Sequence, residues 1–182
     1  AMYGYQFYNM QLAAKEHGWT QFSTMENHYN LLYREDEREL IPICKQMNVS
    51  LMPYSPLVAG HLTRPQWNTD TLRSKTDRVA MGKYDKMEEY DMKIVNRVHE
   101  LAQKHNCKMS QIAIAWQWAK GIASPIIGAT KASYLDDAAG AFDVKLTPED
   151  MAYLEEMYVP HPIVGAINHN PAQGVILLDE KK

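Results

Sequence analysis

The sequence contains little cysteine and no long apolar run. Two cysteines occur among 182 residues, Cys44 and Cys107, and they are too far apart for a Cys-x-x-Cys pair. The seven histidines lack the spacing of metal ligands, so we expect neither a disulfide scaffold nor a metal site. No apolar stretch approaches the roughly 20 residues that span a bilayer. These absences predict a cytoplasmic protein with reduced thiols and no membrane partner.

Charge of either sign is also not in excess. The chain has 19 basic and 22 acidic residues and a formal net charge of -3, with an isoelectric point near 6.2. Without a basic surplus, nucleic acid and anionic membranes are not expected as partners. The 46% share of hydrophobic residues is typical of a globular unit with one core.

Short strand patterns alternate with longer helical patterns. Apolar residues that recur every three to four positions predict helices, and short apolar runs ended by proline or glycine predict strands. Helices are expected over residues 2–17, 33–47, 87–105, 110–121, 133–141 and 148–156. Strands are expected over residues 21–25, 49–54 and 124–127. This alternation is typical of βαβ units with a parallel sheet.

The ends of several elements carry their own signals. Ser110 is expected to cap the helix that follows it, and Thr147-Pro148-Glu149-Asp150 combines a cap, an N1 proline and an acidic first turn. Residues 158–182 contain three prolines and are expected to form an irregular tail. We interpret residues 1–182 as one unit. Because a sheet of about three strands has open edges, we expect a homo-oligomer that pairs them.

Two predicted strands end in small and hydroxyl residues. The first continues as Met52-Pro53-Tyr54-Ser55-Pro56-Leu57-Val58-Ala59-Gly60-His61-Leu62, and the second as Ser124-Pro125-Ile126-Ile127-Gly128-Ala129-Thr130-Lys131. In such segments, backbone N–H groups can turn toward an anion. In a (β/α)₈ barrel, the loops after strands seven and eight are the usual phosphate site. The polar stretch from Gly60 to Lys83 is long enough to be a functional loop.

Together with Asn27-His28-Tyr29-Asn30-Leu31-Leu32, these segments resemble the C-terminal half of the aldo-keto reductase family. The resemblance implies an α/β fold, a partial TIM barrel made from the C-terminal part of a (β/α)₈ barrel, with about three parallel strands and surrounding helices. It also implies hydride transfer from NADPH to a small aldehyde or ketone, with NADP(H) as the cofactor.

The resemblance assigns the first segment to the nicotinamide and the pyrophosphate. Tyr54 matches the aromatic residue that stacks on the nicotinamide ring. The residues along the diphosphate would be Ser55, Pro56, Leu57, Gly60 and Leu62. Arg64 lies in the long loop and could reach a phosphate, although a solvated charge is the simpler interpretation.

The second segment matches the adenosine end of the cofactor. Gly128, Thr130 and Lys131 correspond to the small, hydroxyl and basic residues that grip the 2′-phosphate, which favours NADP over NAD. Asp137 matches the acidic adenine position. Tyr134 departs from the more common glutamine, which makes the adenine contact less certain.

Glu26 departs from the family pattern in which glutamine hydrogen-bonds the nicotinamide carboxamide. An ionised glutamate can accept from the amide NH₂ but cannot donate to its carbonyl. A bias toward bound NADP⁺ is one interpretation, and a position under relaxed constraint is another.

No catalytic residue is assigned. The family uses a tyrosine general acid with a lysine, an aspartate and a histidine from its first four strands, and no position of this chain aligns with them. Three hypotheses therefore stand: the cofactor-binding half of a carbonyl reductase, a catalytically inactive truncated half-barrel that binds nucleotide, and a remnant that only self-associates. A carbonyl substrate would be used only if the missing half were supplied.

Overall fold

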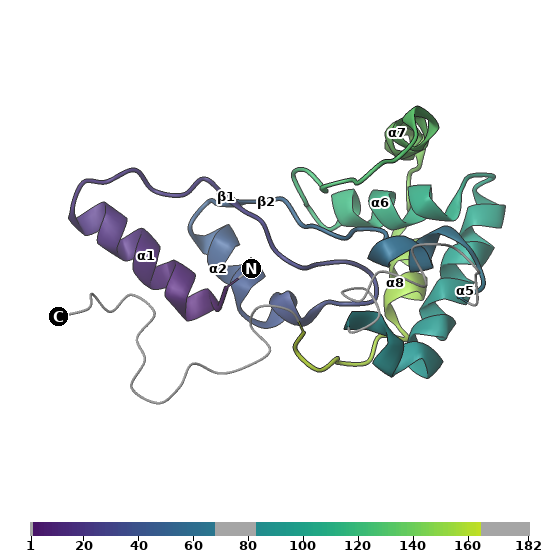
Figure 1. Cartoon of the computed structure of the whole chain (residues 1–182), viewed down its shortest axis with the longest axis horizontal. Coiled ribbons are helices and arrows are strands. Elements are labelled where there is room, and N and C mark those ends of the chain that lie inside the picture. The colour runs from purple at the N-terminus through teal and green to yellow at the C-terminus, as the bar shows by residue number, and fades with distance from the viewer. Residues whose placement is uncertain (1, 68–82, 165–182) are drawn as a thin grey trace.

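The computed structural model of the chain describes residues 2–67 and 83–164, and Figure 1 shows it with the helices and strands labelled. The α-helices are α1 (Gly4–Glu16), α2 (Leu40–Gln46), α5 (Glu88–Lys104), α6 (Met109–Ala119), α7 (Ala132–Ala139) and α8 (Pro148–Glu155). The strands are β1 (Thr24–Met25) and β2 (Ser50–Leu51). The 3₁₀ helices are η1 (Glu35–Arg38), η2 (Val58–Thr63), η3 (Asp85–Met87) and η4 (Gly140–Asp143).

The two strands form a parallel sheet with α2 in the connection between them. Thr24 lies opposite Ser50 and Met25 opposite Leu51. The pairing continues beyond the strands, since the backbone N–H of Tyr54 donates to the carbonyl of Asn27 at 2.9 Å. Parallel strands need a crossover of this kind. The α/β class and the parallel arrangement are therefore confirmed.

A third strand does not form within the described residues, so the expectation of about three parallel strands is wrong in its count. Residues 124–127 run beside β2 in an extended conformation, and the N–H of Ile126 donates to the carbonyl of Pro53 at 2.9 Å. Pro53 faces residues 124–126, since its carbonyl accepts from Ile126, but it has no N–H to donate back to them. A parallel ladder needs donors from both segments, so the pairing stays limited to a few bonds.

The helices agree with the sequence patterns, with two corrections. The Thr147 cap of α8 is confirmed, because its Oγ1 accepts from the N–H of Asp150 at 3.2 Å. The cap of α6 is Lys108, so Ser110 lies inside that helix. The helix expected over residues 33–47 is divided into η1 and α2 at Glu39, whose φ of -142° is not helical.

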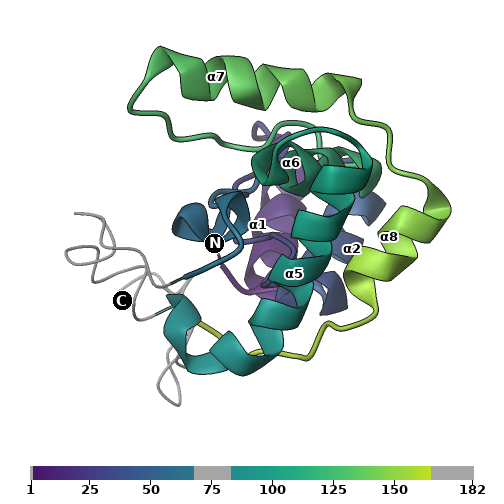
Figure 2. The same ribbon diagram turned by 90° about the vertical axis from the view of Figure 1, so that its right-hand side faces the viewer.

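The core extends from α1 and the strands to α8 and includes the contact between α5 and α6, which pack side by side (Figure 2). Ile94 and Val98 of α5 and Ile112 and Trp116 of α6 are at most 1% exposed. Burial of each such side chain contributes about 1.5–3 kcal/mol. In contrast, α7 has no buried residue. It lies above α6, at the top of Figure 2. Among the described helices, none is long and apolar enough to cross a bilayer.

The expected irregular tail is described only over residues 158–164, which contain no helix or strand. Residues 165–182 lie outside the described part of the chain. In the long loop, residues 58–63 form η2, and residues 68–82 lie outside the described part.

Candidate functional site

Three extended segments end at the same edge of the short sheet. His28 and Tyr54, which follow β1 and β2, form a parallel bridge. The hydrogen bond from Ile126 to Pro53 places residues 124–127 alongside. Ser55 follows Pro53 by two residues, and Gly128 follows Ile126 by two residues. In α/β proteins, ligands bind outside the carboxyl ends of parallel strands, so this edge is the candidate site.

Tyr54 is half-buried at this edge. Its ring is nearly parallel to the imidazole of His28, with centroids 5.0 Å apart and an interplanar angle of 6°. The Nζ of Lys83 lies 4.7 Å from the centroid of the Tyr54 ring. Burial raises the pKa of Tyr54, and the nearby carboxylates of Asp36 and Glu26 raise it further. The phenol is thus held neutral and offers a flat ring rather than an acidic proton.

His28 stands behind this ring and is 2% exposed. Its imidazole also stacks on Tyr33, with centroids 4.2 Å apart, and its Nε2 lies 2.7 Å from the hydroxyl of Tyr84. Burial lowers the pKa of His28 to about 3, with a further contribution from Lys83. His28 is therefore neutral at physiological pH and cannot act as a proton shuttle there.

The loop that leaves Tyr54 has an unusual backbone. Ser55, Val58, Ala59 and Gly60 all have positive φ, at 57°, 53°, 52° and 103°. A positive φ is a genuine outlier for a β-branched residue such as Val58, and such outliers cluster at ligand sites. Left-handed residues turn successive backbone N–H groups toward one side and can form a concave anion site. The N–H groups of Val58 and Gly60 donate within the loop, to Ser55 and Leu57, so the role expected of the loop stays a prediction.

Side chains of this loop contribute less than its backbone. Pro56 and Leu62 are buried; Pro56 has no N–H, and the N–H of Leu62 donates to the carbonyl of Leu57 at 3.3 Å, so neither residue is placed to donate to a phosphate. Arg64 folds back over Gly60: a Cβ added to Gly60 would lie 3.2 Å from its Nη2. The structure thus brings Arg64 next to the turn, and only glycine fits there without strain.

The second predicted group lies on an exposed surface at the start of α7. Gly128, Thr130 and Lys131 are exposed, and Lys131 is the N-cap residue of α7. The Nζ of Lys131 lies 5.8 Å from the ring centroid of Tyr134. Asp137 instead pairs with Lys108, with Nζ and Oδ1 2.5 Å apart.

The predicted residues thus form two groups. Glu26 is exposed and lies near enough to Tyr54 to affect its pKa, so it belongs with Tyr54 and Ser55. Within the described ranges, no hydrogen bond or ion pair joins residues 54–64 to residues 128–137. The two groups are connected by the segments that precede them, which are joined by backbone hydrogen bonds such as that from Ile126 to Pro53.

The sequence analysis missed the residues that surround Tyr54. His28 belongs to the Asn-His-Tyr-Asn motif and Tyr33 follows it, but neither residue was assigned a role from the sequence. Lys83 and Tyr84 follow Tyr54 by about 30 positions in the sequence. Lys83 lies over the Tyr54 ring, and the hydroxyl of Tyr84 contacts His28 behind it. No local pattern signals such a contact, because it depends on how the long loop closes.

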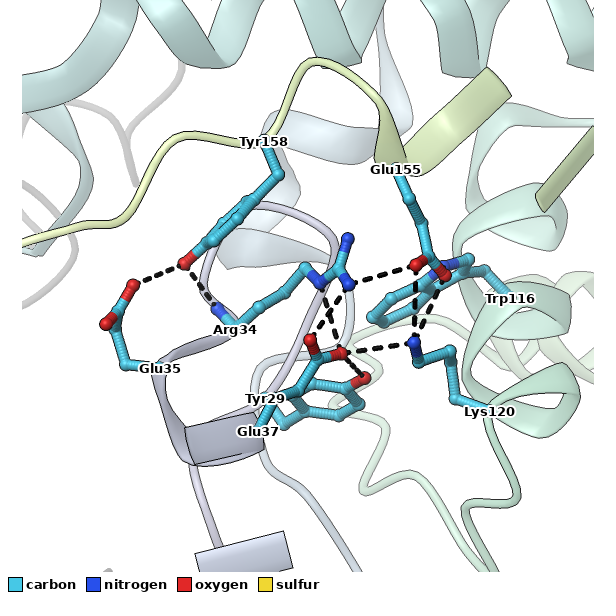
Figure 3. Close-up of polar contacts among 8 residues, drawn as sticks. All are labelled: Tyr29, Arg34, Glu35, Glu37, Trp116, Lys120, Glu155 and Tyr158. Carbon is cyan, nitrogen blue, oxygen red and sulfur yellow. Dashed lines mark hydrogen bonds and ion pairs between the residues drawn. The ribbon is translucent and has the colours of Figure 1, made fainter. Parts of the chain in front are cut away.

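A charged cluster fixes the segment that follows the motif (Figure 3). The Nη2 of Arg34 lies 2.8 Å from Oε2 of Glu37 and 2.9 Å from Oε2 of Glu155. Lys120 lies 3.2 Å from Oε1 of Glu37 and 3.3 Å from Oε1 of Glu155. The hydroxyl of Tyr29 donates to Glu37 at 2.5 Å. Two cations and two carboxylates satisfy one another, so this cluster is a structural clamp rather than a ligand site.

Tyr158 extends the clamp to the C-terminal segment. Its hydroxyl donates to Oε1 of Glu35 at 2.7 Å and accepts from the backbone N–H of Arg34 at 2.9 Å. The indole N–H of Trp116 donates to Glu155 at 2.9 Å. Figure 3 shows these side chains converging from the segment after β1, from α6 and from the end of α8. The segment that follows His28 is therefore fixed from three directions.

Comparison with known proteins shows the family of the chain. The sequence profile of the Aldo/keto reductase family matches residues 4–159. A Schizosaccharomyces pombe protein provisionally named an aryl-alcohol dehydrogenase is 47% identical over 90% of this chain and 46% of its own length. The versiconal hemiacetal acetate reductase of Aspergillus parasiticus is 42% identical over 90% of this chain and 48% of its own length. The chain thus spans about half the length of the curated relatives it matches, and it belongs to the aldo/keto reductase family of oxidoreductases.

Proposed function

We propose that this chain binds NADP(H) and forms the cofactor-binding half of an NADPH-dependent carbonyl reductase. The observation that carries the proposal is the Tyr54 ring, supported by His28 at the joined ends of β1 and β2. A flat ring at this place can fix which face of a nicotinamide is presented for hydride transfer. The loop of left-handed residues that follows can present backbone N–H groups to the diphosphate.

The second group of residues supports NADP over NAD as the cofactor. Thr130 and Lys131 are exposed and precede α7, where a 2′-phosphate could be held by a hydroxyl and a cation. Asp137 is engaged by Lys108, so an adenine contact through Asp137 would require that ion pair to open or to be shared. The adenine role is therefore the weaker part of the assignment.

In the proposed reaction, the bound cofactor supplies a hydride to the carbonyl carbon of an aldehyde or ketone, and a proton goes to the carbonyl oxygen. We assign no general acid to this chain. Tyr54 beside Lys83 has the residue types of such an acid, but burial raises the pKa of Tyr54, whereas a general acid needs a lowered one. Without a general acid, the rate is expected to be about 10²–10⁴-fold lower.

The alternative function is nucleotide binding without chemistry, or self-association alone. Its support is the apolar surface around α7: Leu135 and Phe142 are 55% and 63% exposed. A hollow of about 220 Å³ beside them is lined by Trp118, Pro125 and Ile127, among others. We propose that such surfaces and the open sheet edges bring copies of the chain together in the cytoplasm.

Fluorescence titration of the intact chain with NADPH tests the proposal. We expect enhanced nicotinamide fluorescence and saturable binding, weakened about tenfold by Tyr54→Ala because the stacking surface is lost. Tyr90→Ala, which removes an exposed tyrosine of α5, is the matched control and should bind as the wild type does. Equal binding by both variants would contradict the role of Tyr54. No binding by the wild type would favour self-association alone.

A further inference from the structure

We propose that His28 is a positioning residue that holds the ring of Tyr54 in place for the nicotinamide of NADP(H). The inference rests on the proposed function and adds to it a residue that does not touch the cofactor. It starts from the stack of His28 on Tyr54, with centroids 5.0 Å apart and planes 6° from parallel. An aromatic ring has two faces, and His28 occupies one face of Tyr54. A ligand can therefore stack only on the remaining face, and it would share the ring with the Nζ of Lys83, which lies 4.7 Å from the Tyr54 centroid.

His28 is itself held by a second ring. The Tyr33 ring stacks on the imidazole with centroids 4.2 Å apart and an interplanar angle of 16°. Tyr33 and His28 are 3% and 2% exposed, so neither can swing into solvent without opening the core. The half-buried Tyr54 ring is consequently supported by buried, nearly parallel rings. Aromatic pairs of this kind fix both position and plane.

The hydrogen bonds around His28 determine its tautomer. Asn30 donates from Nδ2 to the carbonyl of Ser55 at 3.1 Å and accepts from the N–H of Leu32 at 3.0 Å, which orients its amide. The same Nδ2 lies 3.4 Å from Nε2 of His28. The Asn30 contact favours the tautomer in which Nε2 accepts and Nδ1 carries the proton, at the cost of a buried Nδ1–H without an acceptor among the described residues.

This tautomer determines the direction of the bond to Tyr84. Since Nε2 carries no proton, the hydroxyl of Tyr84 donates to it across 2.7 Å. Burial raises the pKa of Tyr84, while hydrogen bonds from Ser55 and Asn30 oppose that effect. Tyr84 lies where the chain returns from the long loop. His28 thus connects Tyr84, by a hydrogen bond, to the Tyr54 ring, by stacking.

The imidazole is suited to this task because it stays neutral. It offers a flat apolar face to two tyrosines and one lone pair to Tyr84, and it adds no positive charge behind the Tyr54 ring. Among the described residues, its buried Nδ1 has no hydrogen-bond partner. The residue is thus held by stacking and by Nε2 alone, and a phenyl ring could reproduce the stacking without the bond to Tyr84.

The test compares two ligands on the intact chain: NADPH, and adenosine 2′,5′-bisphosphate, which lacks the nicotinamide. His28→Ala should weaken NADPH binding about three- to tenfold, the range expected from loss of an aromatic pair. It should leave binding of the bisphosphate within about twofold. His28→Phe should recover most of the NADPH affinity, because it restores the ring.

Several results would overturn the inference. If His28→Ala weakened both ligands equally, His28 would be a general structural residue. If His28→Phe bound NADPH as poorly as His28→Ala, stacking would not be its role. If the alanine variant fails to fold, His28→Phe is compared with His28→Leu, and equal NADPH affinities would count against the proposal. Binding of neither ligand by the wild type would instead refute the proposed function itself.

Discussion

His161 and Asp91 form a buried pair that fastens the C-terminal segment to α5. Nε2 of His161 lies 2.9 Å from Oδ1 of Asp91, and the two side chains are 6% and 1% exposed. Nδ1 of His161 lies 2.6 Å from the carbonyl oxygen of Val159. Both ring nitrogens thus face acceptors, and only the doubly protonated imidazolium satisfies both of them.

Stability should therefore depend on pH through His161. Burial lowers the pKa of His161, but Asp91 and Glu35 raise it, so that the pKa lies above the ordinary 6.5. Because the folded chain binds this proton more tightly than the unfolded chain, the stabilisation is complete below about pH 6.5 and is lost as the pH rises through the raised pKa. His161→Gln should lower the free energy of unfolding by about 1.5–3 kcal/mol at pH 6 and by less at pH 8.5.

Urea unfolding at several pH values measures this effect. His17→Gln, which changes a histidine exposed at the end of α1, is the control and should keep the wild-type pH dependence. An identical slope for His161→Gln and the wild type between pH 6.5 and 8.5 would show that His161 is not protonated in the fold.

The clamp in Figure 3 predicts a sharp contrast between neighbouring glutamates. Glu155→Ala would leave Arg34, Lys120 and the indole N–H of Trp116 without a carboxylate they now share. We expect the free energy of unfolding to fall by about 2–4 kcal/mol, because two partly buried cations lose one of their two carboxylates and the buried indole N–H of Trp116 loses its acceptor. Glu156→Ala removes the partner of Arg97, but that glutamate is 68% exposed, so its loss should cost about 0.2–1 kcal/mol.

Thermal or chemical unfolding of the two variants makes the comparison. Equal destabilisation would mean that the clamp contributes no more than a surface ion pair.

The turn at Gly60 predicts a second contrast. Gly60→Ala combines a φ of 103° with a contact at 3.2 Å from Nη2 of Arg64. Gly121→Ala meets a φ of 81° but has nothing within 4 Å of the new Cβ. Both should lose about 1 kcal/mol or more to backbone strain, but only Gly60→Ala should also weaken NADPH binding, because it displaces Arg64. An NADPH affinity that is the same in both variants would separate the Gly60 turn from the cofactor.

Lys131 should decide between the two nicotinamide cofactors. Its exposed ammonium precedes α7, and a charge-assisted bond to a 2′-phosphate is worth about 1.5–3 kcal/mol. Lys131→Ala should therefore weaken NADPH binding about tenfold or more and leave NADH binding unchanged. Lys145→Ala, at another exposed lysine, is the control. Parallel losses for NADPH and NADH would place the 2′-phosphate elsewhere.

Local signals predicted the local features of the fold. The Thr147 cap, the proline at the start of α8 and the periodicity of α5 all lie within one element, and the structure confirms them. The third strand was expected because residues 124–127 are a short apolar run that leads into small and hydroxyl residues. Its pairing is limited by Pro53, and that limit becomes visible only when the two segments are placed side by side.

The candidate site likewise has parts that could be predicted from the local sequence and parts that could not. Tyr54 could be placed at a strand end from its neighbours in sequence, and so could the glycine of the following turn. The rings that support Tyr54 could not, because His28 meets Tyr54 and Tyr84 through contacts between residues far apart in the sequence. The pairing of Asp137 with Lys108 is also non-local. Sequence patterns therefore indicated candidate site residues, and the structure shows what holds Tyr54 in place.

Native mass spectrometry of the intact chain with and without NADPH tests the central claim most directly. The account predicts that each 20.9 kDa protomer retains one NADPH, and that NADH is retained less well. Species that take up no nucleotide at concentrations well above micromolar, whatever their oligomeric state, would contradict the assignment of the Tyr54 edge as a cofactor site.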